Sequence, residues 1–266
     1  MAAEETGAVA ANHAAMMEAV QLAGRIILEN GGETYRVEDT AERMARAFGL
    51  TKAEVFAVPS GVFVTLAFPD GEERTAVMRI RRRGIHLKKV DDANQVSRQV
   101  ADGILSPGEA LERLKEIAAW EDKKGRSLMP WAAAVSSFSF AMMFGGGFFD
   151  GMAAFVCGLL TQGLIRLIRR YSMQSIIASL AGGAICALVP LLLNRLTGLG
   201  VVDAMVAGAL MPLLPGLAMT NAVQDTMRGD MLSGVTHAAQ AILIGALVAG
   251  GALFGQSLFL LIERGL

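Results

Sequence analysis

The residues best suited to chemistry in this sequence are polar side chains within an apolar segment, GALMPLLPGLAMTNAVQD. Asn221 and Asp225 are four residues apart, so a helix would place them on one face, with Thr220 and Gln224 beside them. An amide and a carboxylate in this arrangement offer donors and acceptors to a substrate that carries both an ammonium and a carboxylate group. We expect these four residues to line a binding site. A position of Asp225 at the membrane surface is an equally weighted alternative.

Prolines interrupt the same segment just before these polar residues. Pro212 and the Pro215-Gly216 pair should break the helix, because proline lacks a backbone donor and clashes with the preceding turn. Carbonyl groups freed inside a membrane must bind protein, water or a substrate, and polar groups at that depth usually face a cavity. Pro215 and Gly216 are therefore predicted to belong to the binding site.

Three other residues are candidates for a proton or gating role. His237 has Ser233 and Gln240 within helical reach, although a neutral, hydrogen-bonded histidine is the favoured interpretation. Asp203 is more simply a helix cap than an external gate charge, and Asp230 is expected at the membrane interface. No metal-ligand spacing, phosphate loop or nucleophile motif occurs, so no metal, cofactor or enzymatic activity is predicted.

The elements that must position these residues differ sharply in polarity. The chain is 53% hydrophobic and 18% charged; residues 1–126 hold 18 Lys+Arg and 20 Asp+Glu, whereas residues 127–266 hold 6 and 5. This division predicts a soluble domain followed by a membrane domain. A net charge of -1 without a basic tail argues against nucleic acid as a partner. Cys157 and Cys186 are expected to be small buried hydrophobes, not a disulfide.

Uncharged stretches in the second part predict five transmembrane helices, because about 20 residues cross the hydrocarbon core. The stretches cover residues 127–149, 151–165, 171–194, 204–224 and 231–262. Gly and Ala in the second stretch indicate packing among other helices. Seven Lys and Arg residues lie on the side of residues 1–126, against Arg195 and Arg264 on the other. The positive-inside rule then places the first domain in the cytoplasm and the C-terminus outside the cytoplasmic membrane.

Residues 1–126 have the pattern of an α+β domain. Helical periodicity predicts helices over residues 9–29, 34–48, 90–102 and 107–120, with Thr34 and Ser106 as caps. Three β-rich stretches, at 55–58, 61–68 and 75–80, predict a small antiparallel sheet with a turn at Pro69-Asp70-Gly71. The basic residues Arg79, Arg81, Arg82, Arg83, Lys88 and Lys89 are interpreted as a solvated strand and turn in preference to a ligand site, although beside a membrane they could also meet anionic headgroups. The acidic residues Glu33, Glu38, Asp39 and Glu42 are attributed to the positive end of a helix dipole. A functional carboxylate cluster is the alternative, since Glu38 and Glu42 share one helix face.

Several segments together resemble the threonine/serine exporter family. They are LENGGETYRVEDTAERMARAFGL, VPSGVFVTL, RIRRRGIHLKKVDDANQVSRQV, SPGEALERL, and PLLPG followed by Asn221, Asp225 and the Gly229-Asp230 pair. The resemblance covers nearly the whole chain and implies export of small amino acids, or of related small carboxylates such as dicarboxylates, driven by an ion gradient. Long family members fuse a second membrane unit behind the first, so this chain resembles the larger subunit of the split form.

The leading hypothesis is therefore one subunit of a secondary exporter. We expect it to need a smaller membrane protein of the same family, or a second copy of itself, because a five-helix unit can pair with one of opposite orientation. A membrane-anchored metabolite sensor or scaffold is the alternative, although a plain anchor would not need Pro212, Pro215 and Asn221. An enzyme acting on lipid is disfavoured because no nucleophile and base pair is evident.

Overall fold

The computed structural model of the chain describes residues 2–81, 83–170 and 175–265. These residues form two compact units. The first unit is the chain up to Glu121 together with Leu217–Ala238, and the second is Asp122–Gly216 together with the chain from Ala239 onward. The chain thus divides near the predicted boundary at residue 126, but a segment from the apolar part groups with the charged part. That segment carries Asn221, Asp225 and His237.

Four helices of the first unit follow the predicted periodicity. They are α1 (Ala2–Glu29), α2 (Thr34–Ala47), α3 (Leu87–Ala101) and α4 (Pro107–Ala119). Helix α1 ends before Gly31, which has a φ of 91° that glycine adopts without strain. Helix α4 begins with the predicted cap, since the Ser106 hydroxyl accepts from the Glu109 amide and the Glu109 side chain accepts from the Ser106 amide.

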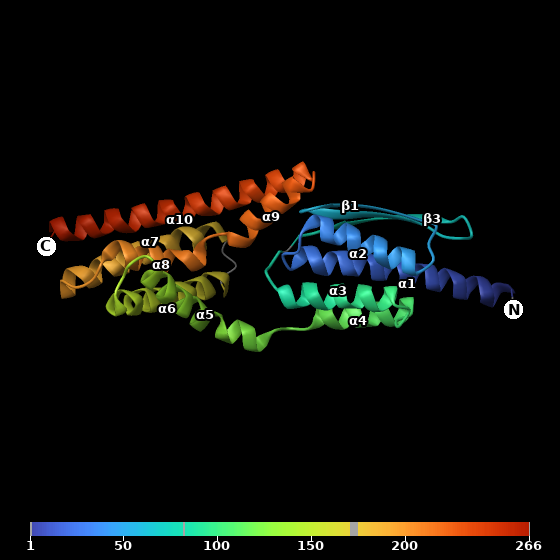
Figure 1. Ribbon diagram of the computed structural model, residues 1–266, viewed down its shortest axis with the longest axis horizontal. Helices are drawn as coiled ribbons and strands as arrows, with labels where there is room; N and C mark the ends of the chain where they lie inside the picture. Colours follow the sequence, from blue (N-terminus) through green and yellow to red (C-terminus); the bar gives the residue numbers. More distant parts are fainter. Residues whose placement is uncertain (1, 82, 171–174, 266) are drawn as a thin grey trace. The chain divides into compact units, whose positions relative to one another are not determined.

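A three-stranded antiparallel sheet covers α1 and α2, as Figure 1 shows. Its strands β1 (Lys52–Val58), β2 (Gly61–Ala67) and β3 (Glu73–Arg79) are joined in the order β1-β2-β3. The predicted hairpin turn is confirmed, because the Phe68 amide donates to the Glu72 carbonyl at 2.8 Å around Gly71. Alternate residues of β2, namely Val62, Val64 and Leu66, face inward and are buried against the helices. The predicted α+β composition of this unit is confirmed.

The apolar part of the chain is helical. Its elements are α5 (Lys123–Met143), α6 (Phe148–Arg170), α7 (Ser175–Thr197), α8 (Val202–Leu210), the short 3-10 helix η1 (Met211–Leu213), α9 (Gly216–Met227) and α10 (Met231–Gly265). The fourth predicted stretch is interrupted at Leu214 and Pro215, between η1 and α9, so the predicted break is confirmed.

Within the described residues, three helices are long and apolar enough to cross a membrane: Phe148–Ile168, Ile176–Thr197 and Met231–Gly265. A fourth span results if Val202–Leu213 and Gly216–Met227 are counted as one broken span. Helix α5 covers most of the first predicted stretch, but its basic start and its four serines lower its hydropathy. A fifth span at α5 therefore stays a prediction.

Small residues allow the helices of the second unit to approach closely, as expected. On α6, Ala154 is fully buried, and a Cβ added at Gly158 would lie 2.9 Å from the Ala134 Cα of α5. The core contains the free thiols Cys157 and Cys186, and their predicted burial is confirmed. Asp150 is also buried and accepts from the Gly147 and Val201 amides, at 2.7 and 2.9 Å. This carboxylate holds the Gly-rich start of α6 to the loop before α8.

Candidate functional site

The turn between α9 and α10 positions the polar residues of the broken segment. Gly229 has a φ of 89° and ends α9, and the Asp230 amide then donates to the Asp225 carbonyl at 2.9 Å. Asp230 Oδ1 accepts from the Ser233 amide at 3.1 Å, so Asp230 caps the start of α10. This turn brings Asp225 of α9 and His237 of α10 side by side.

Asp225 is the centre of the site, and its side chain is fully buried. Its Oδ1 lies 3.1 Å from the Thr34 hydroxyl oxygen, and its Oδ2 lies 2.9 Å from His237 Nδ1. The Thr34 hydroxyl is also 2.8 Å from Asp230 Oδ2. Thr34, Asp225, Asp230, His237 and Arg83, which contacts His237, are called the Asp225 cluster below. All five belong to the first unit.

Hydrogen counting assigns donors and acceptors in this cluster. Arg83 Nη2 lies 3.1 Å from His237 Nε2, and a guanidinium can only donate, so Nε2 must accept. The imidazole proton is then on Nδ1 and is donated to Asp225. The Thr34 hydroxyl has a single hydrogen and lies within hydrogen-bond distance of both carboxyl groups, so it donates to one of them at a time or shares the hydrogen between them. Asp225 and Asp230 are thus linked through one shared donor.

The pKa shifts differ between two neighbouring carboxyl groups, those of Asp230 and Glu38. Burial tends to raise the pKa of Asp230, but hydrogen bonds from Ser233 and Thr34 outweigh it and hold the pKa below its usual value. Burial raises the pKa of Glu38, and the nearby Asp230 carboxylate adds to this effect. Glu38 Oε1 also accepts from the Ala57 amide at 2.9 Å. Among the four acidic residues attributed to the dipole of α2, Glu38 is thus the one influenced by the Asp225 cluster.

Asn221 and Gln224 add unfilled acceptors on the same helix. Asn221 is buried and its Nδ2 donates to the Gly31 carbonyl at 3.2 Å, which joins α9 to the turn after α1. The buried oxygens Asn221 Oδ1, Gln224 Oε1 and Ser233 Oγ have no hydrogen-bond partner among the described residues. Buried polar atoms in native proteins are almost always paired, so such a group indicates a place where another molecule or water can donate.

An aromatic and basic rim lies next to the cluster. The Arg228 guanidinium stacks over the Tyr35 ring at 3.6 Å from its centroid, a cation–π contact between the end of α9 and the start of α2. Arg36 donates to both carboxylate oxygens of Glu33, and this ion pair outweighs the effect of burial and lowers the pKa of Glu33. Tyr35 and Arg228 were not singled out from the sequence.

The other predicted site residues lie in different settings. Thr220 is exposed on α9, Pro215 is partly buried, and Gly216 starts the helix. Asp203 is exposed in the first turn of α8. The N-cap residue of this helix is Val201, so the expectation that the Asp203 side chain caps the helix was wrong. The negative charge of Asp203 is instead favoured by the positive end of the helix dipole. Thr34 was also expected as a cap, but Glu33 is the N-cap of α2 and the Thr34 hydroxyl binds the two carboxylates instead.

Two further groups of polar residues lie outside the cluster. His13 Nδ1 is 3.1 Å from Glu72 and 3.9 Å from Asp70, a spacing that a metal ion could bridge. However, Glu72 already accepts from Arg74 at 2.8 Å, and that positive charge opposes a cation.

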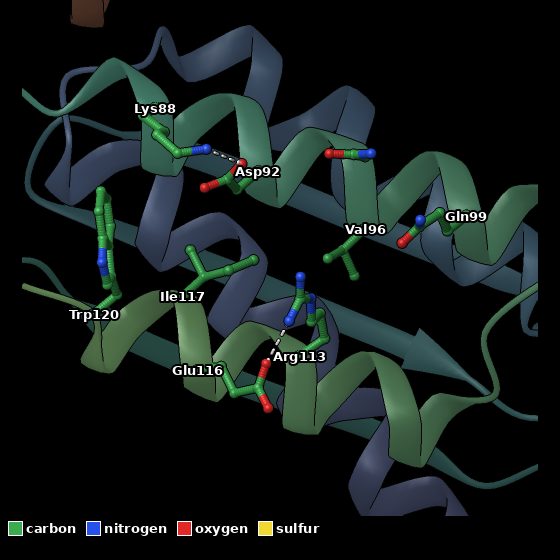
Figure 2. A pocket seen from close by; sticks show the side chains of 9 residues that line it. Lys88, Asp92, Val96, Gln99, Arg113, Glu116, Ile117 and Trp120 are labelled. Carbon is green, nitrogen blue, oxygen red and sulfur yellow. Dashed lines mark hydrogen bonds and ion pairs between the residues drawn. The ribbon is translucent and has the colours of Figure 1, made fainter.

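A cleft of about 380 Å³ lies between α3 and α4. Figure 2 shows the paired charges that line it, Lys88 with Asp92 and Arg113 with Glu116.

Comparison with known proteins adds to this geometry. Residues 18–259 match the family described as "Putative threonine/serine exporter". The chain is 24% identical over 229 residues to a "Probable threonine/serine exporter" of Mycobacterium tuberculosis, which covers 86% of this chain and 43% of that protein. It thus spans less than half the length of that relative.

Two relatives are closer to this chain in length. A "Probable succinate transporter subunit YjjP" from Klebsiella aerogenes is 23% identical, and the alignment covers 82% of this chain and 84% of that protein. The protein of the same name from Escherichia coli is also 23% identical, and its alignment covers 83% of this chain and 86% of that protein. No solved structure matches the chain. Because the family match extends over most of the sequence, the chain belongs to the threonine/serine exporter family.

Proposed function

We propose that this chain is one subunit of a secondary exporter that moves small amino acids of the threonine/serine type, or related small carboxylates such as dicarboxylates, out of the cytoplasm. The observation that carries the proposal is the buried Asp225 cluster, built at the end of the broken α9 segment. A buried carboxylate with a histidine partner in an apolar, membrane-type helix pair is costly, and such groups commonly mark ion or substrate pathways. The names of the relatives support the same class of activity.

Asp225 is proposed to carry the charge that the transport cycle moves. Its two oxygens each accept one hydrogen bond, from Thr34 and from His237. A substrate ammonium group, or a proton, can take the place of either donor. His237 then acts as the proton-exchanging neighbour, because its Nδ1–H faces Asp225 and its Nε2 faces Arg83. Asp230 shares Thr34 with Asp225 and so responds to the same event.

Asn221, Gln224 and Thr220 are proposed to complete the substrate site. Asn221 Oδ1 and Gln224 Oε1 are buried acceptors without a donor among the described residues, which suits an ammonium group. The second Nδ2 hydrogen of Asn221 suits a carboxylate. Pro215 and Gly216 contribute by separating η1 from α9. Asp203, in the second unit, remains a candidate gate charge.

The assembly and orientation are proposed from the sequence. We infer that residues 1–126 face the cytoplasm and that the C-terminus lies outside the membrane, on the count of Lys and Arg in the connections. A smaller membrane protein of the same family, or a second copy of this chain, would complete the path. The word "subunit" in the names of two relatives supports a partner.

The decisive experiment is export by Asp225→Asn and Asn221→Ala variants in cells that lack the native gene. Efflux of labelled threonine, serine and succinate is measured after loading, with the amount of protein in the membrane determined for each variant. The Asn side chain keeps the size of Asp225 but removes its charge, and a charged hydrogen bond is worth about 1.5 to 3 kcal/mol. Export should therefore fall roughly tenfold to a hundredfold.

A matched control separates this effect from a general loss of acidic groups. Asp102→Asn makes the same chemical change at an exposed residue that follows α3, so it should export at the parental rate. Parental export by both Asp225→Asn and Asn221→Ala, at normal membrane levels, would show that the substrate path lies elsewhere.

A further inference from the structure

A second polar groove lies in the first unit. It has a volume of about 700 Å³ and is lined by one face of α1, by Arg83 and Gly84, by the start of α3 and by the end of α4. Its apolar wall includes Leu22, Ile26, Ala118 and Ala119. The groove is large enough for a small metabolite, and residue Arg83 belongs both to it and to the Asp225 cluster.

The charges that line this groove are unequally paired. Arg25 donates to Glu29 at 2.8 Å, and Lys115 lies 3.8 Å from Glu18 and 3.1 Å from Glu112. Lys89 and Arg83 differ from these, because Lys89 Nζ donates to the Ala118 carbonyl at 2.8 Å and Arg83 Nη2 donates to a histidine nitrogen. Both acceptors are neutral. In the described parts of the chain, neither cation has a carboxylate within 4.0 Å, so the groove carries uncompensated positive charge.

The cations of the adjacent cleft between α3 and α4 are ion-paired, unlike Arg83 and Lys89. Its cations Lys88 and Arg113 each bind a carboxylate from their own helix, at 3.0 and 2.6 Å (Figure 2). Partial burial of the guanidinium lowers the pKa of Arg83, and the nearby charge of Asp225 opposes this shift. An anion is therefore better matched to the groove at Arg83 and Lys89 than to the cleft.

We propose that the groove binds a small anionic metabolite with a phosphate or carboxylate head group, held by Arg83 and Lys89. The guanidinium has five N–H donors and uses one on His237, so the others remain for a bidentate contact with the head group. The apolar wall from α1 and α4 accommodates the body of the ligand. This assigns a ligand-binding role to the first unit, beyond transport itself.

The shared residue gives the ligand a route to the Asp225 cluster. A head group that fixes the Arg83 guanidinium also fixes the hydrogen bond to His237 Nε2, and this bond determines which imidazole nitrogen carries the proton that faces Asp225. Occupation of the groove would therefore hold the Arg83 N–H on His237 Nε2. An anionic lipid head group offers the same phosphate chemistry as a free metabolite, so the two sources must be separated by experiment.

The test is isothermal titration calorimetry at low ionic strength, with the full chain in nanodiscs. Inorganic phosphate and succinate are titrated in separate experiments. In neutral phosphatidylcholine, the parental chain should bind at least one of these probes. Arg83→Gln and Lys89→Gln should each weaken the affinity about tenfold or more, since each removes a charged hydrogen bond. Arg113→Gln, which removes a paired cation, should bind normally. Phosphate binding is measured without a transport cycle, so failure of this proposal and failure of the export proposal can be told apart.

The lipid arm uses the same titration in phosphatidylglycerol nanodiscs. If phosphatidylglycerol weakens probe binding to the parental and Arg113→Gln chains alike, the lipid phosphate competes for the groove, whereas unchanged probe binding shows that only a free anion enters it; in either case the anion site stands as proposed. Arg83→Lys keeps the positive charge but loses the paired N–H donors of the guanidinium, so its affinity should lie between those of the parental and Arg83→Gln chains. Absence of binding of both probes to the parental chain, or equal affinity in the parental, Arg83→Gln and Lys89→Gln chains, would overturn the proposal.

Discussion

Replacing Thr34 by valine removes one hydroxyl from the Asp225 cluster and changes little else in shape. The side chain is fully buried, and its hydroxyl lies 3.1 Å from Asp225 Oδ1 and 2.8 Å from Asp230 Oδ2. In the valine variant a methyl group faces both carboxyl groups, and the buried Asp225 loses one of its two hydrogen-bond donors. The variant therefore tests whether the hydroxyl holds α2 to the turn between α9 and α10.

The size of the effect follows from the two contacts. A hydrogen bond to a charged group contributes about 1.5 to 3 kcal/mol, and a buried carboxylate left without its donor bears the desolvation cost as well. For a chain of this size, 1 kcal/mol shifts the melting temperature by roughly 2 to 4 °C, so we expect a decrease of about 3 to 12 °C. Thermal unfolding of the purified protein in detergent, followed by circular dichroism, measures it.

Thr34→Ser is the matched control for Thr34→Val. Serine keeps the hydroxyl and loses one methyl group, which costs only about 0.8 kcal/mol of burial. The valine variant should therefore melt below the serine variant. A double-mutant cycle with Asp225→Asn should give a coupling energy of about 0.5 to 3 kcal/mol. If valine is tolerated as well as serine, or the cycle shows no coupling, the assignment of Thr34 as a bridge between the carboxyl groups is wrong.

Two further predictions concern caps at the ends of helices. Ser106→Ala breaks the capping box of α4 and should lower the unfolding free energy by about 1 kcal/mol, measured by thermal melting, with unchanged export because α4 lies outside the Asp225 cluster. Asp230→Asn tests the lowered pKa of Asp230: its carboxylate stabilises the fold above the ordinary value of 3.8 and loses this contribution as pH falls through the lower folded value. The gap in melting temperature between parental and Asp230→Asn chains should thus be present at pH 6 and shrink towards pH 3, and a gap that is constant with pH would contradict the assignment.

The fold of the first unit could be predicted from the sequence because its signals are local. Gly31 and Gly71 mark turns by adopting positive φ, Ser106 with Glu109 marks a helix start, and the alternation in β2 fixes which face is buried. The break at Pro215 was equally local, since proline cannot continue a helix whatever packs around it. Each of these features depends on residues within a few positions of one another.

The site was only half predictable, because its partners are distant in sequence. Asn221, Asp225 and His237 were found from polar residues in apolar helices, but Thr34 lies 191 residues from Asp225 and Arg83 lies 154 residues from His237. A threonine before a helix has the same sequence signature whether it caps that helix or binds a remote carboxylate. Arg83 was similarly hidden within a basic stretch, where the pattern alone predicts a solvated turn.

These long-range contacts explain why the residues after Pro215 group with the charged part of the chain. Thr34 binds both carboxyl groups of the α9–α10 turn, the Gly31 carbonyl accepts from Asn221, and Tyr35 stacks under Arg228. All three contacts come from the turn after α1 and the first residues of α2, within the segment that carries the resemblance to the exporter family. A change in the protonation of Asp225 or Asp230 must therefore alter the hydrogen bonding of Thr34. This gives the first unit a direct physical means to respond to events at the proposed transport site.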